Sequence, residues 1–436
     1  MITLETRNVI QLGAGMFFVF FAFTTQGFIV QTVLENRHKE DPSIPKEAGY
    51  YSQTIIYGTF IFSCIISPVV VAYLTPKWSL VLGSSGYTIY MAGFTFLNPY
   101  FLFISAAWEG LWAGALWTGM GQYLAINSTE KTLARNSGLV WLIYSSSFLV
   151  GGVFLLVMFK NYNTDTIDME MTRILYGTFA GVSLAGNICF ALLPNMKKEK
   201  EESISVYWNE FREAIFLLIE PQTILLIATF AYSGIELSYW SGVYSNSLSN
   251  TKTFPVNTNI LMALNQMAVG CGEIAGGLSI GVLGSMKNST RRFWIIYVGA
   301  TGCIIAYFIS FMMLPGKSSF EETDELSYIF PNEYLALFGG FLLGLGDCCL
   351  NTQIYSIVPA LFPNKTTQAF AVHKFFHATL STICMFYGSV LVLPWQLLIL
   401  LIFCLLSCAT FTVAEIKYSP KNQKLKSDTE TEKSHL

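Results

Sequence analysis

Apolar stretches of membrane-spanning length recur about twelve times along this chain, in two sets of six on either side of a charged segment, Lys197 to Glu202. A hydrocarbon core roughly 30 Å thick requires ~20 apolar residues of helix for each crossing, so twelve crossings need ~240 residues. The 53% apolar share of the 436 residues supplies that number, and only 12% of the residues are charged. The pattern therefore predicts a polytopic membrane protein.

The twelve stretches mix Leu, Phe, Gly and β-branched residues without the strict alternation of transmembrane barrel strands, so we expect an all-α fold. Their order divides the chain into an N-terminal six-helix bundle (1–194), a cytoplasmic linker with an amphipathic helix (195–221), a C-terminal six-helix bundle (222–416) and a disordered cytoplasmic tail (417–436). The twelve predicted transmembrane helices cover residues 8–34, 48–74, 78–97, 100–126, 136–159, 172–194, 222–246, 258–284, 291–314, 333–361, 366–391 and 394–416.

The placement of basic residues predicts the orientation, because basic loops stay in the cytoplasm. With both termini cytoplasmic, seventeen of the 25 Lys and Arg residues fall on the cytoplasmic side and seven fall outside, with Lys374 inside a span. Nothing in the sequence distinguishes the plasma membrane from an endolysosomal membrane.

Several classes of function lack support in the sequence. No catalytic or phosphate-binding spacing is present, so we do not expect an enzyme. The nine cysteines all lie within predicted spans, which predicts no disulfide framework, and we expect neither a cofactor nor a metal. Basic residues flank the spans instead of forming a patch, so nucleic acid is not an expected partner. The lipid bilayer is the partner that the composition requires.

The two sets of six spans resemble each other. Phe21-Ala22-Phe23 in the first span corresponds to Phe230-Ala231-Tyr232 in the seventh, and the fourth and tenth spans are both glycine-rich and end in polar residues. Two six-helix repeats joined by a charged central loop are the organisation of the major facilitator fold.

Six segments share a pattern with a known family: Gly114 to Leu124, Arg135 to Gly138, Gly234 to Leu237, Ser241 to Tyr244, Gly344 to Asp347 and Asn351 to Gln353. They resemble the Unc-93-like branch of the major facilitator superfamily, and the resemblance runs over about Asn8 to Glu415. One departure is the loop between spans two and three, which is reduced to Thr75-Pro76-Lys77. The resemblance implies either a secondary transporter of an unknown small solute, working by alternating access, or a non-transporting regulator or trafficking chaperone of another membrane protein, such as a potassium channel or a receptor.

Ionisable and polar residues at membrane depth are the candidate functional residues, because each charge there costs at least ~2.5 kcal/mol. In the facilitator fold, spans one, four, seven and ten line a central cavity. We therefore expect a cavity that binds a substrate or a proton. The candidates are Gln26, Glu109, Glu236 and Asp347 on those four spans, Glu273 on span eight, and His373, Lys374 and His377 on span eleven.

Two interpretations of this cluster stay open. In one, a carboxylate exchanges a proton or binds a cationic substrate. In the other, Lys374 pairs with Asp347 or Glu273 and only locks two helices together. Trp108 and Trp112 share a helix face and are a candidate aromatic wall for an organic solute. His373 and His377, four residues apart, have a metal-ligand spacing, but no third ligand is identifiable.

The orientation predicts that the sequons at Asn127, Asn288 and Asn364 face the cytosol and are not glycosylated. Enzymatic deglycosylation of protein expressed in a eukaryotic cell should leave its gel mobility unchanged. A mobility shift that Asn288→Gln abolishes would contradict this topology.

Overall fold

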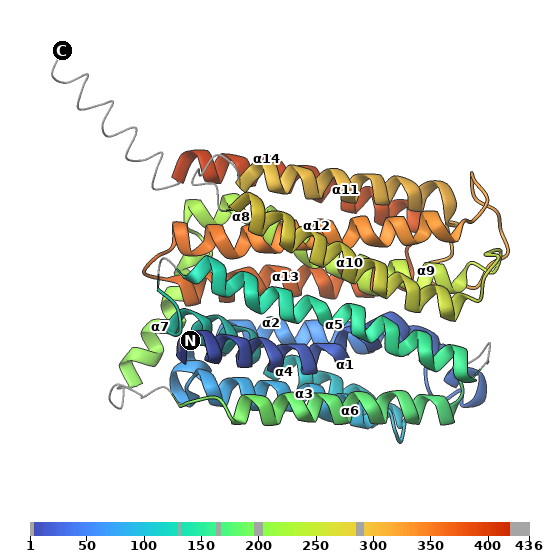
Figure 1. Ribbon diagram of the computed structural model, residues 1–436, viewed down its shortest axis with the longest axis horizontal. Helices are drawn as coiled ribbons and strands as arrows, with labels where there is room; N and C mark the ends of the chain where they lie inside the picture. Colours follow the sequence, from blue (N-terminus) through green and yellow to red (C-terminus); the bar gives the residue numbers. More distant parts are fainter. Residues whose placement is uncertain (1–3, 130–131, 163–166, 196–203, 285–291, 419–436) are drawn as a thin grey trace, which may run out of the picture.

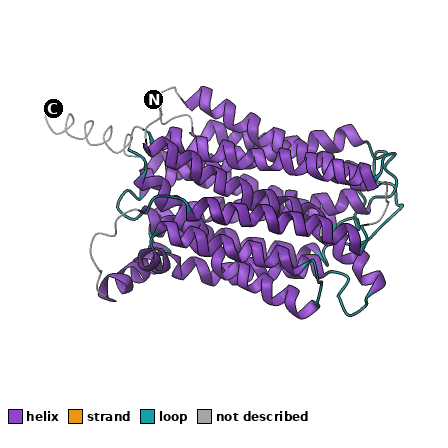
Figure 2. Ribbon diagram, turned by 60° about the horizontal axis from the view of Figure 1, so that its bottom comes forward, coloured by secondary structure: helices purple, strands orange, loops and turns teal. Residues whose placement is uncertain are grey.

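Helices account for nearly all of the computed structural model, which describes residues 4–129, 132–162, 167–195, 204–284 and 292–418. Figure 2 shows helices running the length of the molecule, with loops gathered at its two ends. The helices are α1 (Leu4–Glu40), α2 (Ala48–Leu74), α3 (Pro76–Gly93), α4 (Pro99–Ile126), α5 (Leu133–Tyr162), α6 (Met169–Ala191), α7 (Ile204–Leu217), α8 (Pro221–Ser238), η1 (Tyr239–Val243), α9 (Tyr244–Asn250), α10 (Thr258–Gly284), α11 (Arg292–Met313), α12 (Glu333–Leu361), α13 (Thr366–Gly388) and α14 (Leu393–Tyr418).

Every predicted span coincides with a helix or a helical series, so the all-α prediction is confirmed. The predicted span 222–246 is interrupted: α8 passes through the π-helical turn η1 into α9, and the Tyr244 N–H bonds the Tyr239 carbonyl. Such π turns are rare and occur mostly at functional sites. The predicted linker helix is α7, whereas the predicted disordered tail lies almost wholly outside the described residues.

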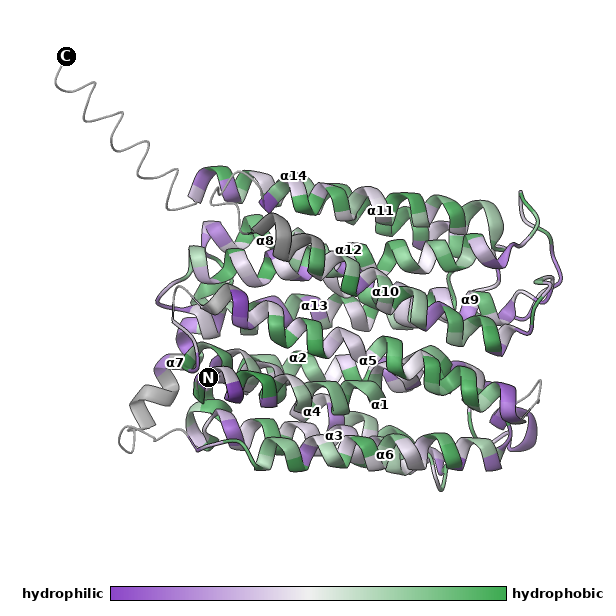
Figure 3. Ribbon diagram, in the orientation of Figure 1, coloured by the Kyte–Doolittle hydropathy of each residue, from purple (hydrophilic) through white to green (hydrophobic). Residues whose placement is uncertain are grey.

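The surface of the bundle is apolar along its length. Large side chains such as Phe62, Phe308 and Leu405 are more than half exposed, and Figure 3 shows hydrophilic residues concentrated near the two ends. A soluble protein does not expose so much contiguous apolar surface, and the chain is an integral multi-pass membrane protein. Within the described ranges, seven helices qualify as spans by length and apolarity alone, or eight if one bent pair is counted, so the number twelve stays a prediction.

The helices before and after α7 form two neighbouring groups (Figure 1). Helix α5 packs against α10 and α2 packs against α13 where the groups meet. The Gln266 amide of α10 donates to the Thr25 hydroxyl of α1 at 2.8 Å across this boundary. The start of α1, the end of α14 and α7 lie together at one end of the bundle, which we call the inner end because it is the predicted cytoplasmic side.

Glycines allow the closest helix contacts. A Cβ atom on Gly344 of α12 would collide with the Val269 carbonyl oxygen of α10, and one on Gly272 of α10 would collide with the Phe341 carbonyl oxygen of α12. Helices in a bilayer associate through close packing, because lipid is as apolar as their own side chains. The reciprocal glycines therefore fix α10 against α12.

The outer end, opposite the inner one, is closed by polar contacts between the two halves. The Glu322 carboxylate, in the loop before α12, lies 3.3 Å from the ammonium group of Lys39, which is in the last turn of α1. It lies 3.5 Å from the ammonium group of Lys252. Deeper, the Asn246 amide donates to the Tyr50 hydroxyl at 3.1 Å and to the Ser319 carbonyl at 2.7 Å. These contacts join α1 and α2 to elements of the C-terminal half.

The inner end is closed by aromatic rings. Trp141 of α5 contacts Tyr355 of α12 edge to face, with ring centroids 5.3 Å apart, and Tyr355 packs on Phe370 of α13 at 4.8 Å. Helix α7 contacts both α2 and α13 on this side. The connection from α2 to α3 is one residue, Thr75, with a positive φ of 74°. The interior between the two halves is thus closed at both ends.

Replacing Gly344 with Ala should lower the free energy of unfolding by about 1–3 kcal/mol, because the added methyl group meets backbone on α10. Gly181→Ala on α6 is the matched control: nothing lies within 4 Å of its Cβ position, so the higher helix propensity of Ala should leave stability unchanged or raise it by up to ~1 kcal/mol. Melting temperatures of the purified proteins would test the pair, and equal temperatures would contradict the packing.

Glu322→Gln should loosen the outer closure with little effect on stability, because half-exposed ion pairs stabilise weakly. A cysteine introduced at Ser241, which lines a small cavity beneath this closure, should react faster with a membrane-impermeant maleimide added from outside. Glu325→Gln, an exposed residue of the same loop, is the control. Unchanged labelling in Glu322→Gln would show that the ion pairs do not hold the outer end closed.

Acid should have the same effect as Glu322→Gln. Burial raises the pKa of Glu322, but Lys252 and Lys39 outweigh it and hold that pKa below its usual value. A lowered pKa contributes stability that is present above the unfolded pKa, about 4.3, and lost as the pH falls through the folded pKa. Maleimide reacts with the thiolate, so labelling slows in every variant as the pH falls, and the parent is compared with Glu322→Gln at each pH. The parent should label more slowly than Glu322→Gln at pH 7, and this difference should vanish as the pH falls through the lowered pKa of Glu322.

Candidate functional site

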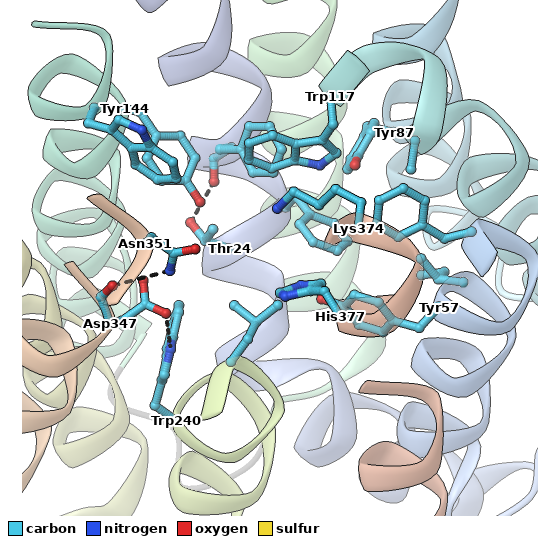
Figure 4. Close-up of a pocket in the computed structure, with 17 residues that line it drawn as sticks. Thr24, Tyr57, Tyr87, Trp117, Tyr144, Trp240, Asp347, Asn351, Lys374 and His377 are labelled. Carbon is cyan, nitrogen blue, oxygen red and sulfur yellow. Dashed lines mark hydrogen bonds between the residues drawn. The ribbon is translucent and has the colours of Figure 1, made fainter. Parts of the chain in front are cut away.

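A cavity of about 60 Å³ lies between the two halves near the middle of the bundle. It has room for a few water molecules. Figure 4 shows charged side chains from the C-terminal half and aromatic rings from both halves facing this space. Its walls are Phe20, Phe23, Thr24, Ile56, Tyr57, Phe60, Tyr87, Ala113, Trp117, Trp141, Tyr144, Leu237, Trp240, Asp347, Asn351, Lys374 and His377.

Of the eight predicted polar residues, three line this cavity: Asp347, Lys374 and His377. The other five are buried within the bundle but outside the cavity wall, which corrects the expectation that all four acids and amides of the cavity-lining spans border it. These five are Gln26, Glu109, Glu236, Glu273 and His373.

Lys374 has no carboxylate partner, contrary to the favoured pairing with Asp347. No carboxylate oxygen of the described chain lies within 4.0 Å of its ammonium group, which instead stands 4.3 Å from the centre of the Trp117 ring. A desolvated cation–π contact stabilises by about 2 kcal/mol, whereas burying an ammonium costs several kcal/mol. The ring therefore offsets only part of the cost of placing this charge here.

Asp347 belongs to a group of acids beside the cavity. The Trp240 indole N–H donates to its Oδ1 at 3.3 Å, and its carboxyl group interacts electrostatically with that of Glu273. Like charges this close repel each other. Ser145 of the N-terminal half donates to Glu273 at 3.3 Å. The acid pair therefore contacts the N-terminal half through Ser145.

The three other candidates on the predicted cavity-lining spans differ in their hydrogen bonding. The Cys303 thiol donates to Glu236 at 3.3 Å. Both carboxyl oxygens of Glu109 and both polar atoms of Gln26 are buried without a hydrogen-bond partner. Buried polar groups in this condition are costly, and neither residue has access to the cavity wall.

The two histidines are joined by a serine and not by a metal. Ser233 Oγ lies 3.3 Å from His373 Nε2 and 2.9 Å from His377 Nδ1, linking α8 to α13. Among the residues that the structure describes, no group of three His, Cys, Asp or Glu side chains could hold a metal ion. The histidine spacing therefore produces an interhelical hydrogen-bond network.

The aromatic wall is formed by different residues from those predicted. Trp108 and Trp112 contact each other with ring centroids 5.9 Å apart, but neither lines the cavity, and Trp108 is 44% exposed on the outer surface of the bundle. The cavity is walled by Trp117 and Tyr144 from the N-terminal half and Trp240 from η1. The glycine-rich segment around Trp117 was a signal for the first of these, and Trp240, one helical turn after Glu236, was a signal for another.

Comparisons with known proteins agree on family and fold. The family description of the ion channel regulatory protein UNC-93 matches residues 40–412. UNC93-like protein MFSD11 of Xenopus laevis is 32% identical over 94% of this chain and 95% of its own length. Protein unc-93 homolog A of Homo sapiens is 21% identical over 91% and 90% of the two lengths.

Solved transporters share the arrangement of helices. A POT family transporter in complex with 5-aminolevulinic acid superposes with a TM-score of 0.63 at 13% identity, over 95% of this chain and 96% of that one. Nucleoside transporter NupG gives 0.58 at 12% identity, over 93% and 99%. At such identities the likeness concerns the fold alone, which is the major facilitator fold. The family match over residues 40–412 and the 32% identity to the Xenopus laevis protein show that the chain belongs to the UNC-93 family.

Proposed function

We propose that this protein is a secondary transporter that moves a small charged solute across its membrane by alternating access. The observation that carries the proposal is the central cavity where the two halves meet. Its wall contains Asp347 and also Lys374, which forms no ion pair with a carboxylate of the described chain. Ionisable groups inside a membrane protein are costly and are a mark of a functional site. A purely structural bundle would be more stable with apolar residues at both positions.

The closures at the two ends suit this function. A cavity of about 60 Å³ is far below the ~300 Å³ of small-molecule sites, so solute binding requires one half to move. The outer polar contacts and the inner aromatic contacts are separate, and each can open without the other. The Glu273–Asp347 pair lies beside the cavity and contacts the N-terminal half through Ser145, which makes it the candidate for coupling proton movement to this motion.

A regulator of a partner membrane protein is the second candidate function. The family description names ion channel regulation. The α2–α3 connection consists of Thr75 alone, without the cluster of charges found in many facilitators. A regulator would use the same bundle as a binding surface and would not need Lys374 or Asp347 for solute exchange.

Untargeted metabolite profiling of cells with and without the protein tests the proposal. At least one solute should change several-fold in accumulation, and Asp347→Asn should abolish the change while expression at the membrane persists. Asp324→Asn, exposed in the loop before α12, should behave as the parent. A metabolite profile that is identical with and without the protein, together with capture of a channel that survives Asp347→Asn, would favour the regulator.

Lys374→Met should abolish exchange without lowering stability, because it removes a buried charge that has no carboxylate partner. The melting temperature of the purified variant should equal or exceed that of the parent. Lys317→Met, at an exposed position, should change neither property. A large loss of stability in Lys374→Met would show instead that the ammonium group is paired and locks helices together.

A further inference from the structure

We propose that the solute is a small zwitterion, whose anionic group binds Lys374 and whose cationic group binds Asp347, with its apolar part against the aromatic rings of the cavity. This inference rests on the proposed transport function, which names only a small charged solute. It follows from the charges and contacts at the two ends of the cavity.

No carboxylate of the described chain lies within ion-pair distance of Lys374. The nearest attractive group is the Trp117 ring, 4.3 Å from the ammonium nitrogen, and the ring supplies no hydrogen-bond acceptor in its plane. A lysine ammonium carries three donors and no acceptor. No hydrogen bond or ion pair of this ammonium is formed within the described ranges. A carboxylate of the solute would supply both the charge and the acceptor atoms.

The Asp347 end can accept a cation. Trp240 holds one carboxylate oxygen at 3.3 Å from its indole nitrogen, and the side chain lines the cavity. Figure 4 shows Asp347 and Lys374 on opposite sides of the same space. An ammonium group near Asp347 would also lie among the rings of Trp240 and Tyr144, and aromatic faces attract cations.

The rest of the wall is mainly apolar. Apart from the charged residues, it consists largely of rings and aliphatic groups, with Thr24, Asn351 and the hydroxyls of Tyr57, Tyr87 and Tyr144 among its uncharged polar groups. Lys374 and Asp347 attract each other only from beyond ion-pair distance. A solute with one charge would contact one of them, whereas a zwitterion would contact both.

A matched series of compounds tests this charge pattern. The purified full-length protein in lipid nanodiscs would be titrated with L-leucine, 4-aminobutanoate and 6-aminohexanoate, which separate the two charges by different lengths. Isoamylamine lacks the carboxylate of leucine, and 4-methylpentanoate lacks its amine. Binding is measured by the ligand-dependent rise in melting temperature and by quenching of tryptophan fluorescence.

At least one zwitterion should bind about tenfold to a hundredfold more tightly than both single-charge compounds, the range expected for losing one charged contact. Lys374→Met should reduce that zwitterion to the affinity of the amine, and Asp347→Asn should reduce it to the affinity of the carboxylate. Lys317→Met should bind as the parent does. The compound series is measured on the parent protein, so it holds even where a variant fails to fold.

The proposal is overturned if 4-methylpentanoate or isoamylamine binds as tightly as every zwitterion, or if no zwitterion binds. Its failure is separate from failure of the transport function. Loss of metabolite exchange in Asp347→Asn, without zwitterion binding, would leave transport standing with another class of solute. Zwitterion binding without any exchange would leave the site standing and remove transport.

Discussion

Close backbone contact between α10 and α12 is the interaction on which the central site depends. Gly272 and Gly344 let the two helices approach until side chains on either one would collide. Glu273 follows the first of these glycines, and Asp347 lies one turn after the second. The same contact that stabilises the C-terminal half therefore brings two interacting carboxyl groups together in a buried interior. The acid pair is a consequence of the packing.

The cavity divides its chemistry unequally between the two halves. The C-terminal half contributes both charges, and the N-terminal half contributes most of the rings. The contact between Lys374 and Trp117 crosses the boundary between the halves, as does the one between Ser145 and Glu273. Under the proposed alternating access, the rings would move relative to the charges, so movement of the halves and the electrostatics of the site would be linked.

The two proposed functions place different demands on this bundle. Transport needs halves that change their relative arrangement, whereas regulation needs only a surface that binds a partner. They differ in whether the cavity is occupied. The charge at Lys374 distinguishes them, because a bundle that only presents a surface gains nothing from a buried ammonium with an aromatic ring as its main contact.

The sequence by itself determined the helices, their approximate bounds and eight polar candidates that are all buried. Runs of ~20 apolar residues permit little else in a bilayer, since every backbone group must be bonded within its own helix. The charged central segment likewise indicated where the two groups of helices divide. The predicted helix 48–74 coincides with α2, and Lys374, Asp347 and His377, which line the cavity, are candidates from the sequence alone.

Only the tertiary structure decided which face of each helix meets the cavity. Trp108 and Trp117 lie on the same helix with similar surroundings in the sequence, yet one is exposed on the outer surface and the other lines the cavity. Lys374 has Trp117 and not Asp347 as its neighbour. The reason is physical: rotation of a helix about its axis is set by the shapes of the neighbours it packs against, and the apolar pattern is nearly the same all round a buried membrane helix.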